Sequence, residues 1–475
     1  MRRITFGVVM SLIVVPGVGS GLALAQTQRP VVNLNLYGGG TRAHSLGGAF
    51  IGLSDDGSAG TWNPAGLTQN DRIYTAIDYG FGQQKVTNSL ESPTDLPILY
   101  ENSSIQNITH FNFLAFNGPL TLKGQRFHLS ASWNRAGFTN FKSSYEMTDF
   151  TGIPIDLPAG VELQGIHTYN EAVGGPEYAT LAMATQLKEE VLSVGFGLNI
   201  FTGKEHDSTQ STIDATEFGI GRRVVTDNVD QVDFSGVSFN FGALFQASQF
   251  TAGLTVKTPF RLESGHDARN AEAVYEVTED SALLITQTSV LLDYKSQVGM
   301  PLQLGLGLTY RPQENFILAA DYEYKGFSQS KVYIQQDLFD PKSDFVESDP
   351  EYKDVHQFRF GMEYQIGVGW GVVPVRAGFR TEPLPLSSAV NVTEPLVDLE
   401  GGTTTSTQGD QITGQVYTVG TGLQWRQVRF DVAWELSSVT QYASGYFSNS
   451  FLLPQFIATR ENHVQRLSLG FTGYF

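Results

Sequence analysis

Apolar and polar residues alternate with a period of two along several segments of this chain. In RFHLSASWN (residues 126–134), Phe127, Leu129 and Trp133 share one face, and polar side chains occupy the other. The same alternation recurs in SVGFGLNIF (193–201), VSFNFGALF (237–245) and LQLGLGLTY (302–310). A period of two is typical of β-strands that have one apolar and one polar or small-residue face.

The connections between these segments alternate in length. Short connections, such as those at residues 247–250 and 426–427, separate the two strands of a pair, and stretches of roughly 20 to 40 residues separate successive pairs. This spacing predicts fourteen strands, at 72–82, 105–116, 126–137, 177–187, 190–201, 232–246, 251–261, 285–311, 315–327, 354–366, 371–381, 412–425, 427–438 and 462–475.

The segment 285–311 is the ambiguous one, because Pro301 interrupts it. Two strands there would give an odd total and would place the two chain ends on opposite sides. We therefore expect one long strand, with Pro301 at a bulge or bend.

Composition places this strand pattern in a membrane. The 475-residue chain has 50 Gly, 12% aromatic and only 41% apolar residues, a combination that suits strands whose every second residue faces lipid. We predict an all-β fold, a 14-stranded antiparallel transmembrane barrel in the cell outer membrane. The alternative is a secreted two-sheet sandwich. The net charge of −18 disfavours nucleic-acid binding, and the absence of Cys excludes disulfides.

The two chain ends add further expectations. Residues 1–25 read as a cleaved signal peptide, with a cationic start and Ala23-Leu24-Ala25 before the cleavage point. Residues 26–71 are rich in Gly and turn residues, and we expect them to form a plug inside the barrel of residues 72–475. The C-terminal RLSLGFTGYF resembles the signal that the barrel assembly machinery reads during biogenesis.

The run SLGGAFIGLSDDGSAGTWNPAGL (45–67) resembles the N-terminal hatch of the FadL/TodX-type outer-membrane transport proteins for long-chain fatty acids and other hydrophobic compounds. The resemblance continues in MPLQLGLGLTYRPQENFILAADYEYKGFSQ, YKDVHQFRFGMEYQ, VPVRAGFRTEPLP and VQRLSLGFTGYF. It implies a 14-stranded barrel plugged by an N-terminal hatch, a kink in the third strand that opens the wall, and sideways exit of the ligand into the membrane.

The resemblance assigns roles to two groups of residues. The hatch elements are Asp55, Asp56, Asn63, Pro64 and Ala65, for which the alternative is an ordinary turn with solvated acids. The lateral gate would lie at Asn134, Ala136 and Gly137, and the alternative there is a strand that simply ends.

A ligand site is expected near the barrel mouth. The stretch after the third strand is apolar for a loop, and we expect a shared hydrophobic pocket or, alternatively, loop-on-loop packing; its residues would be Phe138, Phe141, Phe150, Ile153, Leu284 and Leu291. Candidate cations for a ligand carboxylate are Arg261, Lys325, Arg376 and Arg380, although inward charges commonly pair with one another.

The predicted function is passive uptake of long-chain fatty acids or other hydrophobic compounds. The alternatives are a non-transporting partner of a secretion system or envelope scaffold, and a general porin. Scattered His residues and the lack of a nucleophile elbow disfavour an enzyme, and neither cofactor nor metal is expected. Expected partners are a hydrophobic small molecule and outer-membrane lipid and lipopolysaccharide, and we expect a monomer.

Overall fold

The computed structural model describes residues 38–91, 100–136, 139–147, 161–278, 281–340, 342–393, 405–446 and 455–475. The predicted signal peptide and the start of the predicted hatch lie outside these residues. In the described part of the chain, no helix has the length and hydrophobicity needed to cross a bilayer.

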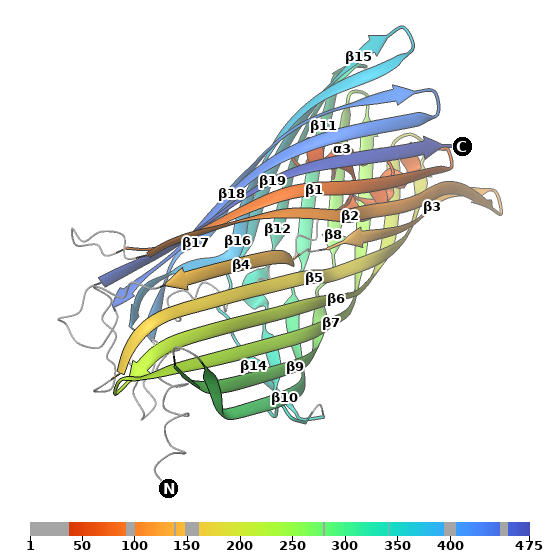
Figure 1. Ribbon diagram of the computed structural model, residues 1–475. Helices are drawn as coiled ribbons and strands as arrows, with labels where there is room; N and C mark the ends of the chain where they lie inside the picture. The colour runs from red at the N-terminus through yellow and green to blue at the C-terminus, as the bar shows by residue number, and fades with distance from the viewer. Residues whose placement is uncertain are drawn as a thin grey trace.

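The described elements are mostly long antiparallel strands (Figure 1). Four short helices are α3 (Thr41–Ser45), α4 (Ala59–Trp62), η2 (Pro64–Gln69) and η3 (Phe327–Gln329). The strands are β1 (Tyr74–Glu91), β2 (Tyr100–Leu122), β3 (Gln125–Arg135), β4 (Thr139–Met147), β5 (Val161–Lys188), β6 (Leu192–Glu217), β7 (Ile220–Ala247), β8 (Phe250–Lys257), β9 (Phe260–Val277), β10 (Ala282–Met300), β11 (Gln303–Gln313), β12 (Phe316–Lys325), β13 (Val332–Gln335), β14 (Phe345–Ser348), β15 (Val355–Val368), β16 (Gly371–Thr393), β17 (Thr405–Trp425), β18 (Val428–Tyr446) and β19 (Gln455–Tyr474).

These segments form a closed barrel of 14 wall strands, as predicted. Three wall strands are each interrupted and consist of two segments: β3 with β4, β8 with β9, and β10 with β11. The short strands β13 and β14 form a hairpin outside this count. The first and last strands close the barrel, since Tyr74 pairs with Tyr474 at one end of a continuous ladder. The prediction of one strand bent at Pro301 is confirmed, because β11 continues beside β8 where β10 lies beside β9.

The predicted long loops at 202–231 and 262–284 are wrong. β6 and β7 continue as a regular ladder to the turn at Phe218 and Gly219, and β9 and β10 pair out to residues 277 and 282. The extensions of β6 and β7 carry polar residues on both faces, as in KEHDSTQSTIDATE. The alternation that marks the part of the wall around the C-terminus, which we call the lower wall, is therefore absent there.

Apolar side chains cover the outer face of the lower wall. Members of this surface include Phe196, Leu254, Leu306, Phe360, Val419, Trp434 and Leu469, all exposed. Their neighbours along each strand point inward and are polar, glycine or alanine. This arrangement satisfies the backbone within a closed sheet and presents an apolar band to lipid.

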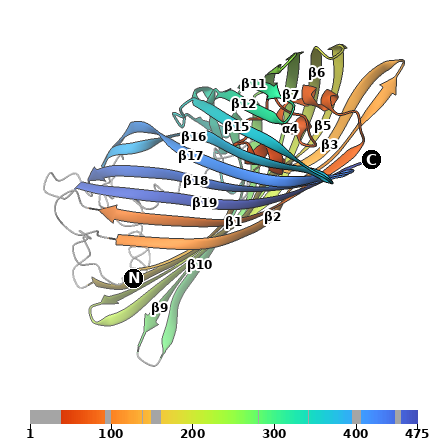
Figure 2. The same cartoon turned by 90° about the horizontal axis from the view of Figure 1, so that it is seen from above.

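Residues 38–69 fold inside the wall, near the end that carries the C-terminus (Figure 2). Inward-facing wall glycines give this plug its room. A Cβ at Gly378 would lie 2.2 Å from the Gly47 backbone nitrogen, and one at Gly307 would lie 2.3 Å from that of Gly52. Gly195, Gly253, Gly361 and Gly420 likewise abut plug atoms. The glycines of the alternating strands therefore make space for a second layer of chain.

Substituting Gly378 with Ala is expected to loosen the plug, because the new methyl group would overlap backbone atoms of Leu46 and Gly47. Overpacking of this kind costs roughly 1–3 kcal/mol. Hydrogen exchange of residues 41–53 would measure the effect. Gly367→Ala is the matched control, because a Cβ at Gly367 meets nothing within 4 Å. Equal exchange in both variants would contradict the proposed contact.

Candidate functional site

The plug is hydrogen-bonded to inward-facing polar residues of the wall. Asp321 on β12 accepts from the backbone nitrogens of Phe50 and Ile51, at 2.6 and 2.7 Å. On β17, the Thr418 hydroxyl accepts from Gly47 N and donates to Ser45 O, both at 3.0 Å. These bonds satisfy plug backbone groups that have no partner strand.

A buried ion-pair network holds the plug to the wall. Plug residue Arg42 makes two hydrogen bonds to the Glu363 carboxylate, at 2.8 and 3.1 Å, and also bonds Asp55. Arg376 donates to the same carboxylate at 2.5 Å and to Asp431 at 2.7 Å. Burial acts to lower the pKa of Arg42, but the carboxylates of Asp55 and Glu363 outweigh it and raise that pKa well above its ordinary value.

The Asn63-Pro64-Ala65 motif joins the plug to the wall. Asn63 caps η2 by accepting from Ala65 N, and its amide donates to Ile51 O at 3.0 Å and to Ala243 O on β7 at 3.2 Å. Pro64 supplies the first residue of η2 with its φ already set. The Asn63 side chain thus stabilises the turn at the start of η2 and binds the plug to β7.

The two predicted hatch acids lie in different surroundings. Asp55 bonds Arg42 and also reaches Arg311 on β11 at 3.3 Å. Asp56 instead accepts from the backbone and hydroxyl of Ser58, at 2.9 and 2.7 Å. Only the first acid therefore connects the plug to a wall cation through a described ion pair.

His44 on α3 is a titratable residue of the plug that lies against the wall. Its ring lies 3.2 Å from Gly38 O and 3.8 Å from the Glu435 carboxylate. Burial lowers the pKa of His44, Arg466 and Arg380 act in the same direction, and Glu435 opposes them. The folded protein therefore favours neutral His44.

We expect plug stability to fall as the pH drops below about 6.5, since the unfolded chain then binds a proton that folded His44 does not. The loss is about 1.4 kcal/mol for each unit by which the folded pKa is lowered. Urea unfolding between pH 5 and 8 would measure it, with His44→Gln expected to flatten this part of the profile. An unchanged slope in His44→Gln would assign the pH dependence to other groups.

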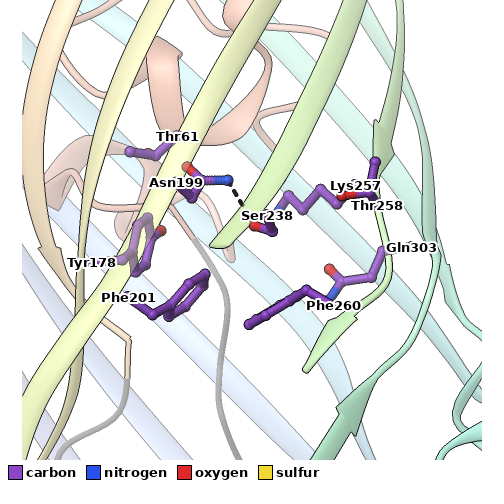
Figure 3. A pocket seen from close by; sticks show the side chains of 9 residues that line it. All are labelled: Thr61, Tyr178, Asn199, Phe201, Ser238, Lys257, Thr258, Phe260 and Gln303. Atoms are coloured by element: carbon purple, nitrogen blue, oxygen red, sulfur yellow. Dashed lines mark hydrogen bonds between the residues drawn. The ribbon is translucent and has the colours of Figure 1, made fainter. Parts of the chain in front are cut away.

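A small cavity lies above the plug (Figure 3). It has about 330 Å³ of empty space, including its open side, and is lined by Thr61, Tyr178, Asn199, Phe201, Ser238, Lys257, Thr258, Phe260 and Gln303. Figure 3 shows aromatic rings on one side and polar groups nearer the plug. The ring centroids of Phe201 and Phe260 lie 4.7 Å apart, and those of Tyr178 and Phe201 lie 5.1 Å apart.

The aromatic side belongs to a larger apolar cluster, which we call the lumen cluster. Its buried members are Ala136, Tyr178, Phe201, Val232, Phe234, Leu262, Val298, Met300, Phe327 and Val355, with Phe260, Val332 and Tyr352 packed against them. These residues come from inward-facing positions, which lower in the barrel carry mostly polar or small side chains. The lumen wall formed by these residues is therefore apolar.

Polar groups lie beneath the lumen cluster. Thr180 donates to Asn199 at 2.7 Å, and Asn199 donates to Ser238 at 3.2 Å. Lys257 interacts electrostatically with Glu323, which also pairs with Lys325 and Arg359. An amphipathic molecule could place its polar end here and its apolar part against the rings.

The third wall strand is interrupted beside this cavity. The β2–β3 ladder ends at the pair Phe113 and Asn134, while Ala136 N bonds Pro176 O of β5 at 3.0 Å. Over the described residues, β4 pairs only with β5, and the part of β2 before Phe113 pairs only with β1. Asn134 bonds the Tyr178 hydroxyl and Ala136 is buried, whereas Gly137 lies outside the described residues.

Neighbouring strands are distorted at the same level. Gly174 and Gly175 of β5 have φ of 120° and 130°, and Gly203 of β6, paired with Pro176, has φ of 123°. Only glycine adopts such angles without strain. The interruption of the third strand is thus part of a wider bend in the wall.

The predicted ligand residues are largely not tested. Leu284 and Leu291 lie on β10 and are 47% and 67% exposed. Phe138, Phe150 and Ile153 lie outside the described residues, and only the backbone of Phe141 is described. The cavity aromatics Tyr178, Phe201 and Phe260 were not predicted. The sequence did contain one indication. Phe201 lies two residues after Asn199, so both side chains face the same, inward side of their strand.

The four predicted cations are placed as follows. Arg376 and Arg380 are buried, and both pair with wall carboxylates, Arg380 with Glu435 at 2.6 Å. Lys325 lies 3.5 Å from Glu323. Arg261 is exposed, stacks 4.3 Å from the Tyr333 ring centroid and donates to Gln297. A ligand carboxylate at the first three would have to compete with these carboxylates.

Solved structures share this architecture. A FadL homologue of Pseudomonas aeruginosa is 14% identical, with 92% of this chain and 98% of that chain covered and a TM-score of 0.57. The toluene transporter TodX of P. putida is 12% identical, with 93% and 99% covered and a TM-score of 0.55. At this identity the likeness establishes the fold. Among curated protein sequences none matches.

Barrel closure, the apolar outer band and the shared fold place the protein in the outer membrane. Within the described residues, no group of three or more His, Asp or Glu side chains is arranged to hold a metal ion. The BamG family model matches residues 41–386, which include the plug and the wall through most of β16. Because this match spans well over half of the sequence, the chain belongs to the BamG family.

Proposed function

We propose that the protein carries hydrophobic small molecules, such as long-chain fatty acids or hydrocarbons, passively from the barrel end that lies away from the plug into the surrounding membrane. The ligand enters the lumen, binds against the lumen cluster above the plug and leaves sideways near Ala136. The plug stays in place. Outer-membrane lipid receives the cargo, and lipopolysaccharide surrounds the outer end of the wall.

One observation carries this proposal: an apolar cluster lies above a sealed plug and next to an interrupted wall strand. Ala136 belongs to the lumen cluster and directly follows Arg135, the last residue of β3 in its ladder with β5. An apolar molecule gains free energy by moving from water to the cluster and then to lipid, so the path needs no energy source. The solved FadL homologue and the toluene transporter share the fold, which supports this use of it.

The polar solute channel that the sequence left open fits the geometry poorly. Plug residues such as Leu46, Phe50 and Leu53 are fully buried against the wall. A water-filled route through the described barrel would have to break the Arg42 and Asp321 contacts.

Native mass spectrometry would test the proposal. The detergent-solubilised barrel is incubated with a mixture of long-chain fatty acids, alkanes and monoaromatics, and we expect one hydrophobic class to be retained. Phe201→Asp is expected to abolish retention, because a carboxylate would then lie within the lumen cluster. Phe218→Asp is the matched control, since Phe218 lies at an exposed turn. Retention that is equal in the two variants would contradict the ligand site.

A non-transporting role in outer-membrane protein assembly or secretion is the second candidate. The BamG family name, which carries the prefix of the barrel assembly machinery, favours it, as does the small size of the cavity. If no hydrophobic class is retained by the folded wild-type protein, this candidate replaces transport. The exposed apolar strand β10 would then be the first surface to examine for protein contacts.

A further inference from the structure

Three neighbouring strands bring an acid, an imidazole and a hydroxyl into one line. Asp230 Oδ2 on β7 lies 2.8 Å from His266 Nδ1 on β9, and His266 Nε2 lies 3.0 Å from Ser296 Oγ on β10. The His266 ring also stacks on Tyr294, with centroids 4.5 Å apart and planes 2° apart. The stacking and the bond to Asp230 fix the orientation of the imidazole.

Strand register explains why these side chains share a face. His266 pairs with Val232 on one side and with Tyr294 on the other. Asp230 and Ser296 each lie two residues from those partners, so all three project from the same side of the sheet. That side also carries Val232, Leu262, Val298 and Met300 of the lumen cluster. The three residues therefore border the apolar lumen.

We propose that Ser296, His266 and Asp230 form a hydrolytic site for carboxylic esters with an apolar acyl chain. The geometry matches the relation of nucleophile, base and orienting acid in serine hydrolases, which is recognised by distances and roles and not by sequence order. Ser296 and His266 are the catalytic residues, and Asp230 is a positioning residue. The apolar chain preference rests on the proposed function, whereas the hydrolytic step does not.

The chemistry balances with water as co-reactant. Ser296 Oγ attacks the ester carbonyl carbon while His266 Nε2 takes the hydroxyl proton. The carbon–oxygen bond to the leaving alcohol then breaks, and His266 returns the proton to that alcohol. Water attacks the acyl-serine, again giving a proton to His266, which passes it to Ser296 as the acid leaves. Asp230 holds the Nδ1 proton and stabilises the imidazolium throughout.

The residues around His266 and Asp230 are compatible with this reaction. The His266 and Asp230 side chains are 14% and 18% exposed, so the site is shielded but reachable. Among the described residues, Asp230 forms its ion pair with His266 and none with a Lys or Arg side chain. Its charge is thus directed at the imidazole. Described cations on these strands pair with other acids, as Lys295 does with Glu263 and Arg269 with Asp227.

Covalent labelling with a fluorophosphonate tests the site in the full-length protein in lipid vesicles. We expect one adduct by intact mass, located on the peptide that contains Ser296. Ser296→Ala should remove it, and His266→Gln and Asp230→Asn should slow labelling by about 10²- to 10⁴-fold. Asp230→Glu should label faster than Asp230→Asn, because Glu retains the carboxylate that orients His266. If Asp230 had only a structural role, the two variants would not be expected to differ in this way. Ser264→Ala is the matched control, because Ser264 pairs with Ser296 across the strands.

The outcomes separate this proposal from the proposed function. Absence of an adduct on the folded wild-type barrel, or equal labelling of Ser296→Ala, overturns the hydrolytic site. Folding is checked independently by heat-modifiable electrophoretic mobility. Hydrolysis of p-nitrophenyl esters should favour dodecanoate over butyrate. Hydrolysis that depends on Ser296 but shows no chain-length preference would support the hydrolytic site and contradict its preference for an apolar chain. Retention of a hydrophobic ligand without labelling would support the proposed function and contradict the hydrolytic site.

Discussion

Replacing Glu363 with Ala is expected to lower the free energy of unfolding by about 3–5 kcal/mol, the usual effect of removing one partner from a buried ion pair. Glu363 is 1% exposed and accepts hydrogen bonds from both Arg42 and Arg376. Its loss leaves the Arg42 guanidinium with Asp55 as its remaining described ion-pair partner and leaves Arg376 with Asp431. Urea unfolding in lipid vesicles, followed with hydrogen exchange of residues 41–69, would measure the change.

The matched control for this prediction is Glu263→Ala. Glu263 pairs with Lys295 at 2.7 Å, but the two side chains are 30% and 47% exposed. An exposed pair contributes about 0–1 kcal/mol, so this variant should be nearly neutral. If the two Glu variants unfold alike, the network around Glu363 does not hold the plug.

Blocking the wall beside Ala136 is expected to abolish protein-dependent transfer of a hydrophobic probe into vesicle membranes. The chain contains no Cys, so Ala136→Cys introduces a single thiol. A bulky reagent attached there by a disulfide would occupy the end of the β3 ladder and the adjoining lumen cluster. Reduction with dithiothreitol should restore transfer in the same sample.

Ala182→Cys serves as the control for the blocking experiment. Ala182 is also buried and faces inward, but it packs against the plug residues Ala59 and Leu67. Intact mass confirms that each variant carries its label. Transfer should persist in labelled Ala182→Cys, because the proposed route does not pass this side of the plug. Transfer that persists in labelled Ala136→Cys would contradict lateral exit there.

The lower wall was predictable from sequence because lipid imposes the alternation. LQLGLGLTY places Leu304, Leu306 and Leu308 on the lipid face, and the glycines between them face the plug. The outer halves of β6 and β7 were missed because both of their faces carry polar residues. In such a strand no hydrophobic period remains, and only the partner strand defines the element.

The plug was predictable as a segment but its attachment was not. Composition and the Asn63-Pro64-Ala65 motif mark a compact, turn-rich run before the first strand. The bond between Arg42 and Glu363 joins residues 321 positions apart, so it depends on wall register. The arrangement of Asp230, His266 and Ser296 likewise depends on the register of three strands, and no local sequence motif indicates it.

Cross-linking of a photoreactive aliphatic diazirine probe would map the path of a hydrophobic molecule through the barrel. The probe is added outside vesicles that contain the intact protein, cross-linked by light, and its attachment sites are read by peptide mass spectrometry. We expect saturable labelling of the lumen cluster, including Phe201 and Ala136, with none around Leu67 and Ala184 on the far side of the plug. Labelling beneath the plug, or no saturable labelling anywhere, would contradict the proposed route.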